Sequence, residues 1–222
     1  MYYDANNTTE FATSLQTKKS TSTQCPRKVF VPVNDGRLVA VNADTGKACT
    51  DFGQNGEVNL QEFMPYAYPG GYNPTSPGVV TGSTVVIAGS VTDNYSNKEP
   101  SGVIRGYDVN TGKLLWVFDT GAADPNTMPG EGTTFVHNSP NAWAPLAYDA
   151  KLDIVYVPTG VGTPDIWGGD RTELKERYAN SMLAINASTG KLIWNFQTTH
   201  HDLWDMDVPS QPSLADIKDK SG

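Results

Sequence analysis

The chain has 222 residues and a formal net charge of −8 at pH 7, which argues against nucleic acid and anionic membrane surfaces as binding partners. Only 18% of its residues are charged and 38% are hydrophobic, a composition that argues against long solvated helices and against disorder. No apolar run approaches the roughly 20 residues of a membrane-spanning helix, and residues 1–24 form a polar segment without a signal core. The length suits one large domain or a piece of a longer protein.

Short apolar segments that end at Gly- or Pro-containing loops predict β-strands along the chain. The candidates are Lys28–Val33, Ser83–Ser90 and Leu152–Gly160. Helical character is weak, and only Arg171–Ser181 predicts a helical turn or two. The chain contains 21 Gly and 15 Pro, so frequent turns between short strands are expected.

Three longer segments repeat one pattern, namely Gly36–Phe52, Gly102–Phe118 and Asn180–Phe196. Each has an apolar strand, an Asn/Asp-x-x-Thr-Gly-Lys turn and a second apolar strand. The Thr-Gly pairs begin at positions 45, 111 and 189, which gives spacings of 66 and 78 residues. Gly adopts the positive φ of a tight turn and the Asn or Asp side chain caps it, so each segment predicts a hairpin.

The repeat also carries an aromatic anchor in two of its three copies. Trp116 and Trp194 lie four residues after the turn Gly, whereas Thr50 holds that place in the first copy. A unit of four short strands that recurs at this period is typical of an all-β β-propeller with Trp-docking blades, and the alternative is a sandwich with incidental hairpins. Three blades do not close a ring of about four to eight. We therefore expect part of a longer propeller over residues 25–217, followed by a tail at 218–222, or an assembly with other chains.

The chain has two cysteines, Cys25 and Cys49. They can pair in an oxidising compartment, but the sequence alone does not place them within bonding distance. The absence of a CxxC motif argues against a zinc site built from thiolates.

Four loop motifs, "GSVTDN", "NSPNAWAP", "TPDIWGG" and "HHDLWDMD", occur in this order along the chain. With the Trp-docking repeats, they resemble the pyrroloquinoline-quinone-dependent dehydrogenases, or quinoproteins, and are most similar to the membrane-bound glucose dehydrogenase branch. The resemblance runs from about Cys25 to about Ile217. It implies a central fragment with about three blades of an eight-bladed propeller. The remaining blades and the N-terminal membrane segment of the family are missing from this chain.

The resemblance implies a role for five residues. Asp205 corresponds to the catalytic base, and Trp143 to the tryptophan that stacks under the quinone ring. Asp93, Asn94 and Thr163 correspond to the ligands of a Ca²⁺ or Mg²⁺ ion. The alcohol branch has Asn at the position of Thr163 and an adjacent-cysteine disulfide that this chain lacks, so the glucose branch is favoured.

The chemistry of quinone-dependent oxidation suits these residue types. A carboxylate such as Asp205 can take the hydroxyl proton as the hydride leaves, and we expect Asp202 and the neighbouring histidines to orient it. Ca²⁺ and Mg²⁺ prefer oxygen ligands, and a flat cofactor packs well on an aromatic ring. His200 and His201 point to opposite faces of an extended segment, which argues against a zinc pair.

Each of these residues also has a purely structural interpretation. An Asp-Asn pair in a loop often caps a turn, as Asp93 and Asn94 would, and Trp143 between two prolines is often a core residue. The aspartates of "HHDLWDMD" can form a solvated acidic loop. The structural interpretations lose weight because all four motifs occur together, each at the end of a strand.

The sequence therefore predicts a quinoprotein dehydrogenase that oxidises an aldose, glucose to gluconolactone. The resemblance implies electron transfer to ubiquinone at the periplasmic face of the inner membrane. The alternatives are a quinate or shikimate dehydrogenase of the same family, and a non-catalytic propeller scaffold or inactive fragment. The sequence leaves open the substrate, the metal and the oligomeric state, as well as whether the fragment folds alone.

Overall fold

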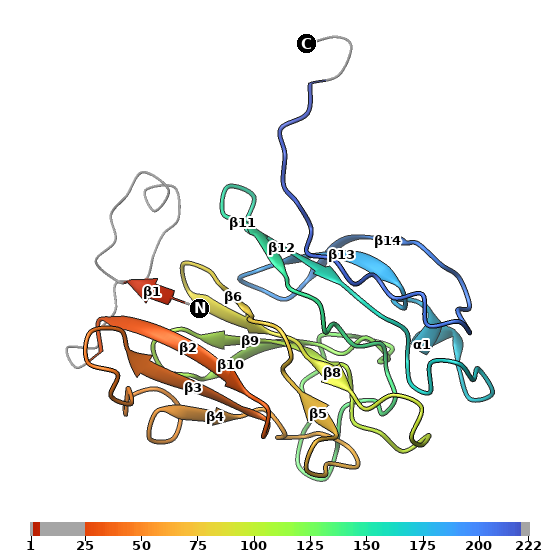
Figure 1. Cartoon of the computed structure of the whole chain (residues 1–222), viewed down its shortest axis with the longest axis horizontal. Coiled ribbons are helices and arrows are strands. Elements are labelled where there is room, and N and C mark those ends of the chain that lie inside the picture. The colour runs from red at the N-terminus through yellow and green to blue at the C-terminus, as the bar shows by residue number, and fades with distance from the viewer. Residues whose placement is uncertain (1, 5–24, 219–222) are drawn as a thin grey trace.

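The computed structural model describes residues 2–4 and 25–218, and it shows an all-β molecule built from three four-stranded antiparallel sheets (Figure 1). We call these sheets blades 1, 2 and 3. They confirm the predicted all-β fold and the four-stranded blade. Of the polar segment 1–24, only Tyr2–Asp4 is described, as the first strand of blade 1, and residues 219–222 lie outside the described part.

Each blade is a row of adjacent antiparallel strands. Blade 1 contains β1 (Tyr2–Asp4), β2 (Arg27–Val33), β3 (Arg37–Asn42) and β4 (Glu57–Asn59). Blade 2 contains β6 (Val79–Val80), β7 (Thr84–Ile87), β9 (Ile104–Asp108) and β10 (Leu114–Phe118). Blade 3 contains β11 (Ala147–Asp149), β12 (Ile154–Pro158), β13 (Ser181–Asn186) and β14 (Leu192–Gln197). A separate pair joins β5 (Tyr72–Asn73) to β8 (Ser90–Val91), and α1 (Glu173–Glu176) is a single helical turn.

The repeated Thr-Gly turns form as the sequence predicts. Asn42 Oδ1 accepts hydrogen bonds from the backbone N–H groups of Asp44 and Thr45, at 2.8 and 3.0 Å. Asp108 Oδ1 and Asn186 Oδ1 cap the second and third turns in the same way. The turn glycines have φ values of 68°, 72° and 72°, which favour Gly because it has no Cβ.

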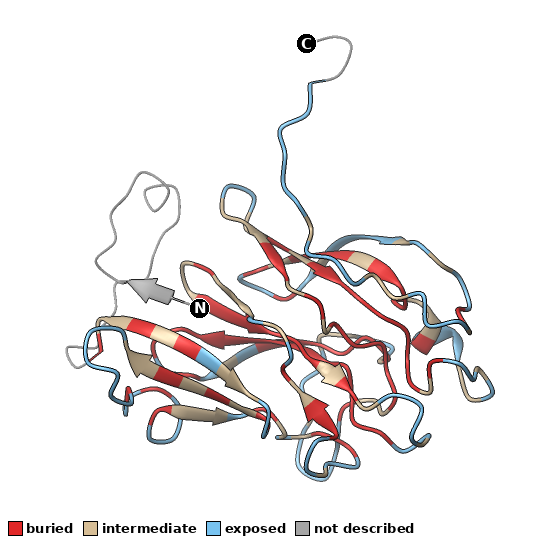
Figure 2. Cartoon of the chain, viewed as in Figure 1, coloured by how far each residue is buried: buried red, intermediate tan, exposed pale blue. Residues whose placement is uncertain are grey.

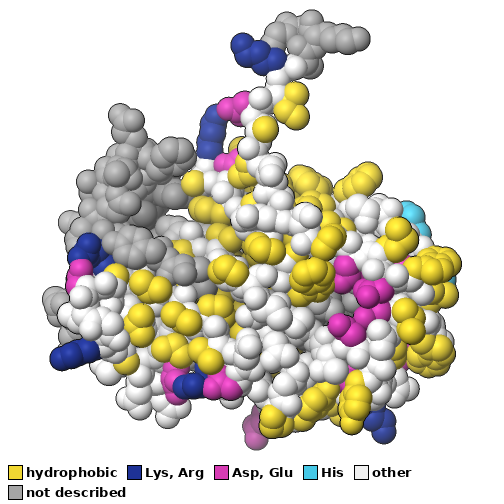
Figure 3. Space-filling model, viewed as in Figure 1, with side chains coloured by type: hydrophobic (Ala, Val, Ile, Leu, Met, Phe, Trp, Pro, Cys, Tyr) yellow, Lys and Arg dark blue, Asp and Glu magenta, His cyan; other side chains and the backbone are white. Residues whose placement is uncertain are grey.

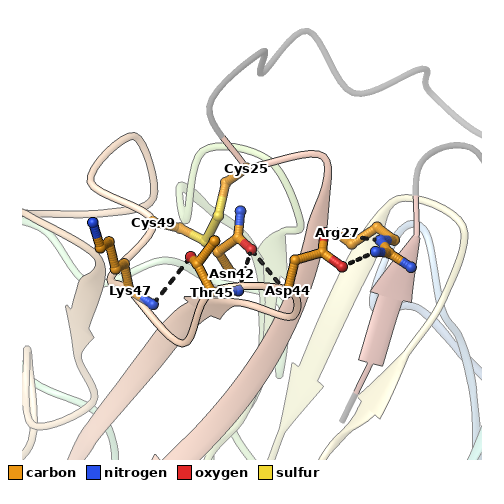
Figure 4. The surroundings of a disulfide bond; sticks show 7 residues. All are labelled: Cys25, Arg27, Asn42, Asp44, Thr45, Lys47 and Cys49. Carbon is orange, nitrogen blue, oxygen red and sulfur yellow. Dashed lines mark hydrogen bonds and ion pairs between the residues drawn. A yellow bond between two sulfur atoms is a disulfide. The ribbon is translucent and has the colours of Figure 1, made fainter.

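The first repeat differs from the prediction after its turn. Only an isolated bridge between Val41 and Ala48 follows, in place of a second strand, and the fourth strand of blade 1 comes later, at β4. Cys49 is bonded instead to Cys25 in a disulfide (Figure 4). This bond answers the question that the sequence left open, and it fixes the chain where the large anchor residue is absent.

The core consists of two apolar layers, one between blades 1 and 2 and one between blades 2 and 3 (Figure 2). Trp116 belongs to the second layer and is 5% exposed. Its indole nitrogen donates a 3.0 Å hydrogen bond to the carbonyl oxygen of Ala187 in the turn of blade 3. A Cβ on Gly190 would lie 2.6 Å from the Trp116 ring, so the close stacking requires Gly there. Trp194, at the same place in blade 3, is 42% exposed.

Two further predictions concern local elements. The predicted strand Ser83–Ser90 is divided into β7 and β8, because the chain leaves blade 2 near Gly89, where a Cβ would lie 2.6 Å from Asn73 O. The predicted helical segment forms one turn, with Thr172 as its N-cap. None of the helices in the described ranges has the length and apolar character to cross a membrane.

Candidate active site

The five residues predicted for the site lie in loops that follow β8 of the separate strand pair or that flank strands of blade 3. Asp93 and Asn94 lie just beyond β8, Thr163 lies beyond β12, and Asp205 lies beyond β14. Trp143 precedes β11. Figure 3 shows acidic side chains gathered on one face of the molecule. The fold thus brings together loops that are far apart in the sequence.

Asn94 interlocks the loop after β8 with the loop after β12. It has a φ of 49°, a conformation that Asn tolerates better than most residues. Its amide oxygen accepts hydrogen bonds from the backbone N–H groups of Asp165 and Ile166, at 3.0 and 3.2 Å. Its amide nitrogen donates to Asp165 Oδ2 at 3.3 Å. The amide oxygen therefore already receives two N–H donors.

Thr163 is buried and joined to the same two loops. Its hydroxyl donates a 3.2 Å hydrogen bond to the carbonyl oxygen of Thr92. Its own carbonyl accepts a 2.8 Å hydrogen bond from the buried Asn138 side chain. The peptide bond between Thr163 and Pro164 is cis. These contacts place Thr163 close to the residue that precedes Asp93.

Asp165 is a buried carboxyl that the sequence analysis did not select. It is only 3% exposed, and its Oδ1 atom has no hydrogen-bond partner among the described residues. Burial raises the pKa of Asp165 to about 8, and the charges of Asp93, Asp205 and Asp207 act in the same direction. A buried anion with an unsatisfied oxygen beside other anions is stable only when a proton or a cation compensates its charge.

Asp93 lies in the same field of negative charge. Burial is the main cause that raises its pKa, followed by the charges of Asp205 and Asp207. Among the described residues, no group of three or more His, Cys, Asp or Glu side chains is placed to hold one metal ion. A divalent ion here would have to draw its other oxygen ligands from backbone, hydroxyl, water or cofactor atoms.

Trp143 is fixed by the carboxylate of Asp207. Its indole Nε1 donates a 2.6 Å hydrogen bond to Asp207 Oδ2, and the backbone N–H of Val161 donates to Asp207 Oδ1 at 2.7 Å. Burial raises the pKa of Asp207, while these two hydrogen bonds lower it. A Cβ on Gly160 would lie 2.3 Å from this carboxylate, so the arrangement requires Gly at that position.

The loop that carries Asp205 is organised by its buried neighbour Asp202. The Asp202 carboxylate accepts backbone hydrogen bonds from Trp204 at 2.9 Å and from Met206 at 2.6 Å. It also accepts a 2.9 Å hydrogen bond from the Asn180 side chain. Asp205 lies on this loop with a φ of 60° and is exposed. Asp202 thus shapes the backbone that presents Asp205.

The expectation that the histidines orient Asp205 is wrong for His201. Its Nδ1 atom lies 3.1 Å from Glu176 Oε1, so the ring turns toward the helical turn α1. His200 is exposed. The loop of Asp205 is supported by Asp202, which accepts the backbone N–H groups of Trp204 and Met206.

Arg171 joins the loop after β12 to the loop after β14, and the sequence analysis did not select it. Its guanidinium donates to the carbonyl oxygens of Pro164 and Asp165, at 2.9 and 2.8 Å. It also donates to the carbonyl of Asp202 at 2.7 Å. A fork of several donors suits this bridging of carbonyl groups. A lone Arg in a helix-like segment gave no sequence signal for it.

A cavity of about 370 Å³ is lined by Tyr68, Thr92 and Tyr95. Tyr68 donates a 2.6 Å hydrogen bond to Glu99 Oε2, and Tyr95 is 78% exposed. The cavity at Thr92 lies next in sequence to Asp93.

The site thus combines the exposed carboxylate of Asp205, the neighbouring carboxyls of Asp93 and Asp165, and the fixed indole of Trp143. Such a set can bind a cation and a flat ring and can remove a proton from a hydroxyl group.

Comparison with known proteins agrees with this chemistry. The family model described as "PQQ: Glucose/ethanol/alcohol dehydrogenase, beta-propeller domain" matches residues 4–222. The chain is 96% identical over 222 residues to quinoprotein glucose dehydrogenase A of Acinetobacter calcoaceticus, covering 100% of this chain and 28% of that protein. It is 45% identical over 202 residues to the quinate/shikimate dehydrogenase (quinone) of Acinetobacter baylyi, covering 90% of this chain and 25% of that protein.

A solved structure shows the same fold. The crystal structure of quinohemoprotein alcohol dehydrogenase from Comamonas testosteroni matches with a TM-score of 0.64 and 26% identity, over 86% of this chain and 29% of that chain. This chain therefore spans between a quarter and a third of the length of these relatives. The resemblance inferred from the loop motifs is confirmed, and the chain belongs to the PQQ family, the β-propeller domain of glucose, ethanol and alcohol dehydrogenases.

Proposed function

We propose that this chain forms the cofactor- and metal-binding part of a quinoprotein glucose dehydrogenase. In that enzyme, glucose is oxidised to gluconolactone. The observation that carries the proposal is the convergence of Asp205, the Asp93–Asp165 pair and Trp143 at one site. Near identity to the Acinetobacter calcoaceticus protein supports the choice of substrate.

The residues fit both a divalent metal and a quinone. The unpartnered Asp165 Oδ1 and the anionic surroundings of Asp93 suit a hard cation. Thr163 offers a further oxygen. Trp143 is half-buried and held at its indole nitrogen, so part of its ring remains accessible for stacking. When bound, pyrroloquinoline quinone supplies the acceptor for two electrons and the metal supplies electrophilic assistance.

Asp205 is the base in this proposal. Its carboxylate accepts the proton of the substrate hydroxyl as the hydride leaves the neighbouring carbon. The turn around Asp202 holds it in place. Because Asp205 is exposed, the proton passes readily from its carboxyl to solvent. The hollow beside Tyr68 and Tyr95 offers room for a sugar ring.

We further propose that the electrons pass to ubiquinone at the periplasmic face of the inner membrane, in a longer protein that supplies the other blades and a membrane segment. Both statements rest on the family relationship and on the short span of this chain relative to the proteins it matches. A quinate dehydrogenase of the family is the natural comparison, because one such protein is also similar over most of the chain.

Asp205→Asn tests the proposal. In a protein that carries this chain together with the remaining blades, the variant should lose glucose oxidation and keep quinone binding, measured as quenching of tryptophan fluorescence. Asp216→Asn, in the exposed C-terminal segment, is the matched control. Unchanged turnover in Asp205→Asn would exclude Asp205 as the base. Faster oxidation of quinate than of glucose by the unmodified protein would reassign the substrate.

A further inference from the structure

Two of the three side chains assigned to the metal from the loop motifs already take part in hydrogen bonds. The Asn94 amide oxygen receives two backbone N–H donors. The Thr163 hydroxyl donates to Thr92 O, and a neutral hydroxyl is a weaker ligand than a carboxylate. Only Asp93 brings a charge to the ion. These three groups give a hard divalent cation little compensation for the water that it loses.

Asp165 can supply a second carboxylate ligand for the cation. Its side chain is 97% buried, being 3% exposed, and Oδ1 has no hydrogen-bond partner among the described residues. The other oxygen, Oδ2, accepts from the Asn94 amide at 3.3 Å. The carboxylate is thus held by one oxygen while the other stays unsatisfied. Unsatisfied buried carboxylate oxygens are costly and rare, so a ligand for Oδ1 is expected.

The groups around the Asp165 carboxylate favour a cation as the ligand of Oδ1. The Asp93 and Asp165 side chains lie in hydrogen-bond contact, and two carboxylates that are both acceptors need a positive charge between them. Arg171 is a positive group in these surroundings, but its guanidinium donates to the backbone carbonyls of Pro164, Asp165 and Asp202. Its hydrogen bonds therefore leave the Asp165 carboxylate without a direct cationic contact.

We propose that Asp165 is a direct ligand of the divalent metal, that it shares the ion with Asp93, and that Asn94 positions the Asp165 carboxylate through its side-chain amide. This inference rests on the proposed function, because it concerns the same metal. Two carboxylates fit Ca²⁺ or Mg²⁺, which complete their coordination with water, hydroxyl or cofactor oxygens. The hydroxyl of Thr163 becomes a minor contributor.

Calcium binding to the chain itself tests the inference without quinone or sugar. Isothermal titration with CaCl₂, after chelator treatment, compares the unmodified chain with Asp165→Asn and Thr163→Val. Glu131→Gln is the matched control, because it removes the same charge from an exposed position. Loss of groups that merely support metal ligands costs about 10- to 100-fold in affinity, so Asp165→Asn should weaken calcium binding at least about tenfold. Glu131→Gln should stay within about threefold of the unmodified chain, and Thr163→Val should lose less affinity than Asp165→Asn.

Two results would overturn the inference. One is a calcium affinity of Asp165→Asn equal to that of Glu131→Gln, and the other is a folded unmodified chain that binds no calcium. If Asp165→Asn does not fold, Asp165→Glu decides, since it keeps the charge and moves the carboxylate by one methylene. A direct ligand then changes the preference between Ca²⁺ and Mg²⁺, and a residue outside the coordination sphere leaves it unchanged.

The same samples separate this inference from the proposed function. A chain that binds calcium through Asp165 but shows no fluorescence quenching by pyrroloquinoline quinone would contradict the proposed function alone. A chain that binds the quinone, with a calcium affinity indifferent to Asp165, would contradict the inference alone.

Discussion

The indole nitrogen of Trp143 donates a 2.6 Å hydrogen bond to Asp207 Oδ2, across 64 positions of sequence. The second oxygen of Asp207 accepts the backbone N–H of Val161. One carboxylate therefore fixes both the ring proposed as the cofactor floor and the loop that leads to Thr163. The orientation of the ring depends on a residue from the loop of the proposed base.

Removal of that carboxylate should loosen the ring. Asp207→Ala leaves two donors without acceptors, and each unsatisfied buried donor costs about 1–3 kcal/mol. The free energy of unfolding in urea should fall by roughly 2–6 kcal/mol for the two donors together, and quenching by the quinone should need a higher quinone concentration. Asp216→Ala, in the exposed C-terminal segment, should change neither quantity. Unfolding and quenching like those of the unmodified chain would show that Asp207 does not hold Trp143.

The two anchor tryptophans should differ in their contribution to stability. Trp116 is buried between blades 2 and 3, bonded to Ala187 and packed on Gly190. Trp116→Ala should therefore lower the free energy of unfolding by about 3–5 kcal/mol. Trp194 is 42% exposed, so Trp194→Ala should cost about 1 kcal/mol or less in this chain. Urea unfolding followed by circular dichroism measures both, and equal losses would contradict the docking of blade 3 on Trp116.

Reduction of the disulfide should destabilise blade 1. The bond between Cys25 and Cys49 closes a loop with a sequence separation of 24 residues, for which the loss of unfolded-state entropy predicts a stabilisation of roughly 3 kcal/mol. The double variant Cys25→Ser, Cys49→Ser should lose about that much in thermal or urea unfolding. A reducing agent should lower the stability of the unmodified chain to the same level and leave the double variant unaffected. A stability indifferent to reduction would argue against the bond.

Asp119 should make the stability depend on pH. Burial raises the pKa of this carboxyl, although the backbone N–H groups of Val136 and Gly121 oppose the shift. The folded chain therefore holds the proton more tightly than the unfolded chain, and the contribution of Asp119 to stability falls as pH rises above the ordinary value of 3.8.

Asp119→Asn removes this titration. The difference in free energy of unfolding between the unmodified chain and the variant should shift in favour of the variant between pH 4 and pH 7. Urea unfolding at several pH values measures the difference, in which the contributions of all other carboxyls cancel. A constant difference, or a shift in the opposite direction, would contradict a raised pKa.

The sequence by itself determined the repeated unit and the loops in which the proposed site residues lie. The Asn/Asp-x-x-Thr-Gly turns are local, since the side chain, the donors it receives and the glycine lie within a few residues, and all three form. The same locality explains why the site loops were placed at strand ends. The prediction of a second strand in the first repeat was wrong because that strand does not depend on local contacts alone. There the turn forms, but Cys49 is bonded to Cys25, which lies before β2.

Only the tertiary structure decided how the site residues work together. Asn94 reaches Asp165 across 71 positions, and Arg171 reaches the carbonyl of Asp202 across 31. Asp165 becomes distinctive only after burial, when it loses water and lies beside Asp93, and no pattern around it in the sequence records this. Burial and long-range contact are properties of the packed blades, and they give these aspartates the environments on which their proposed roles as metal ligand, positioning group and base rest.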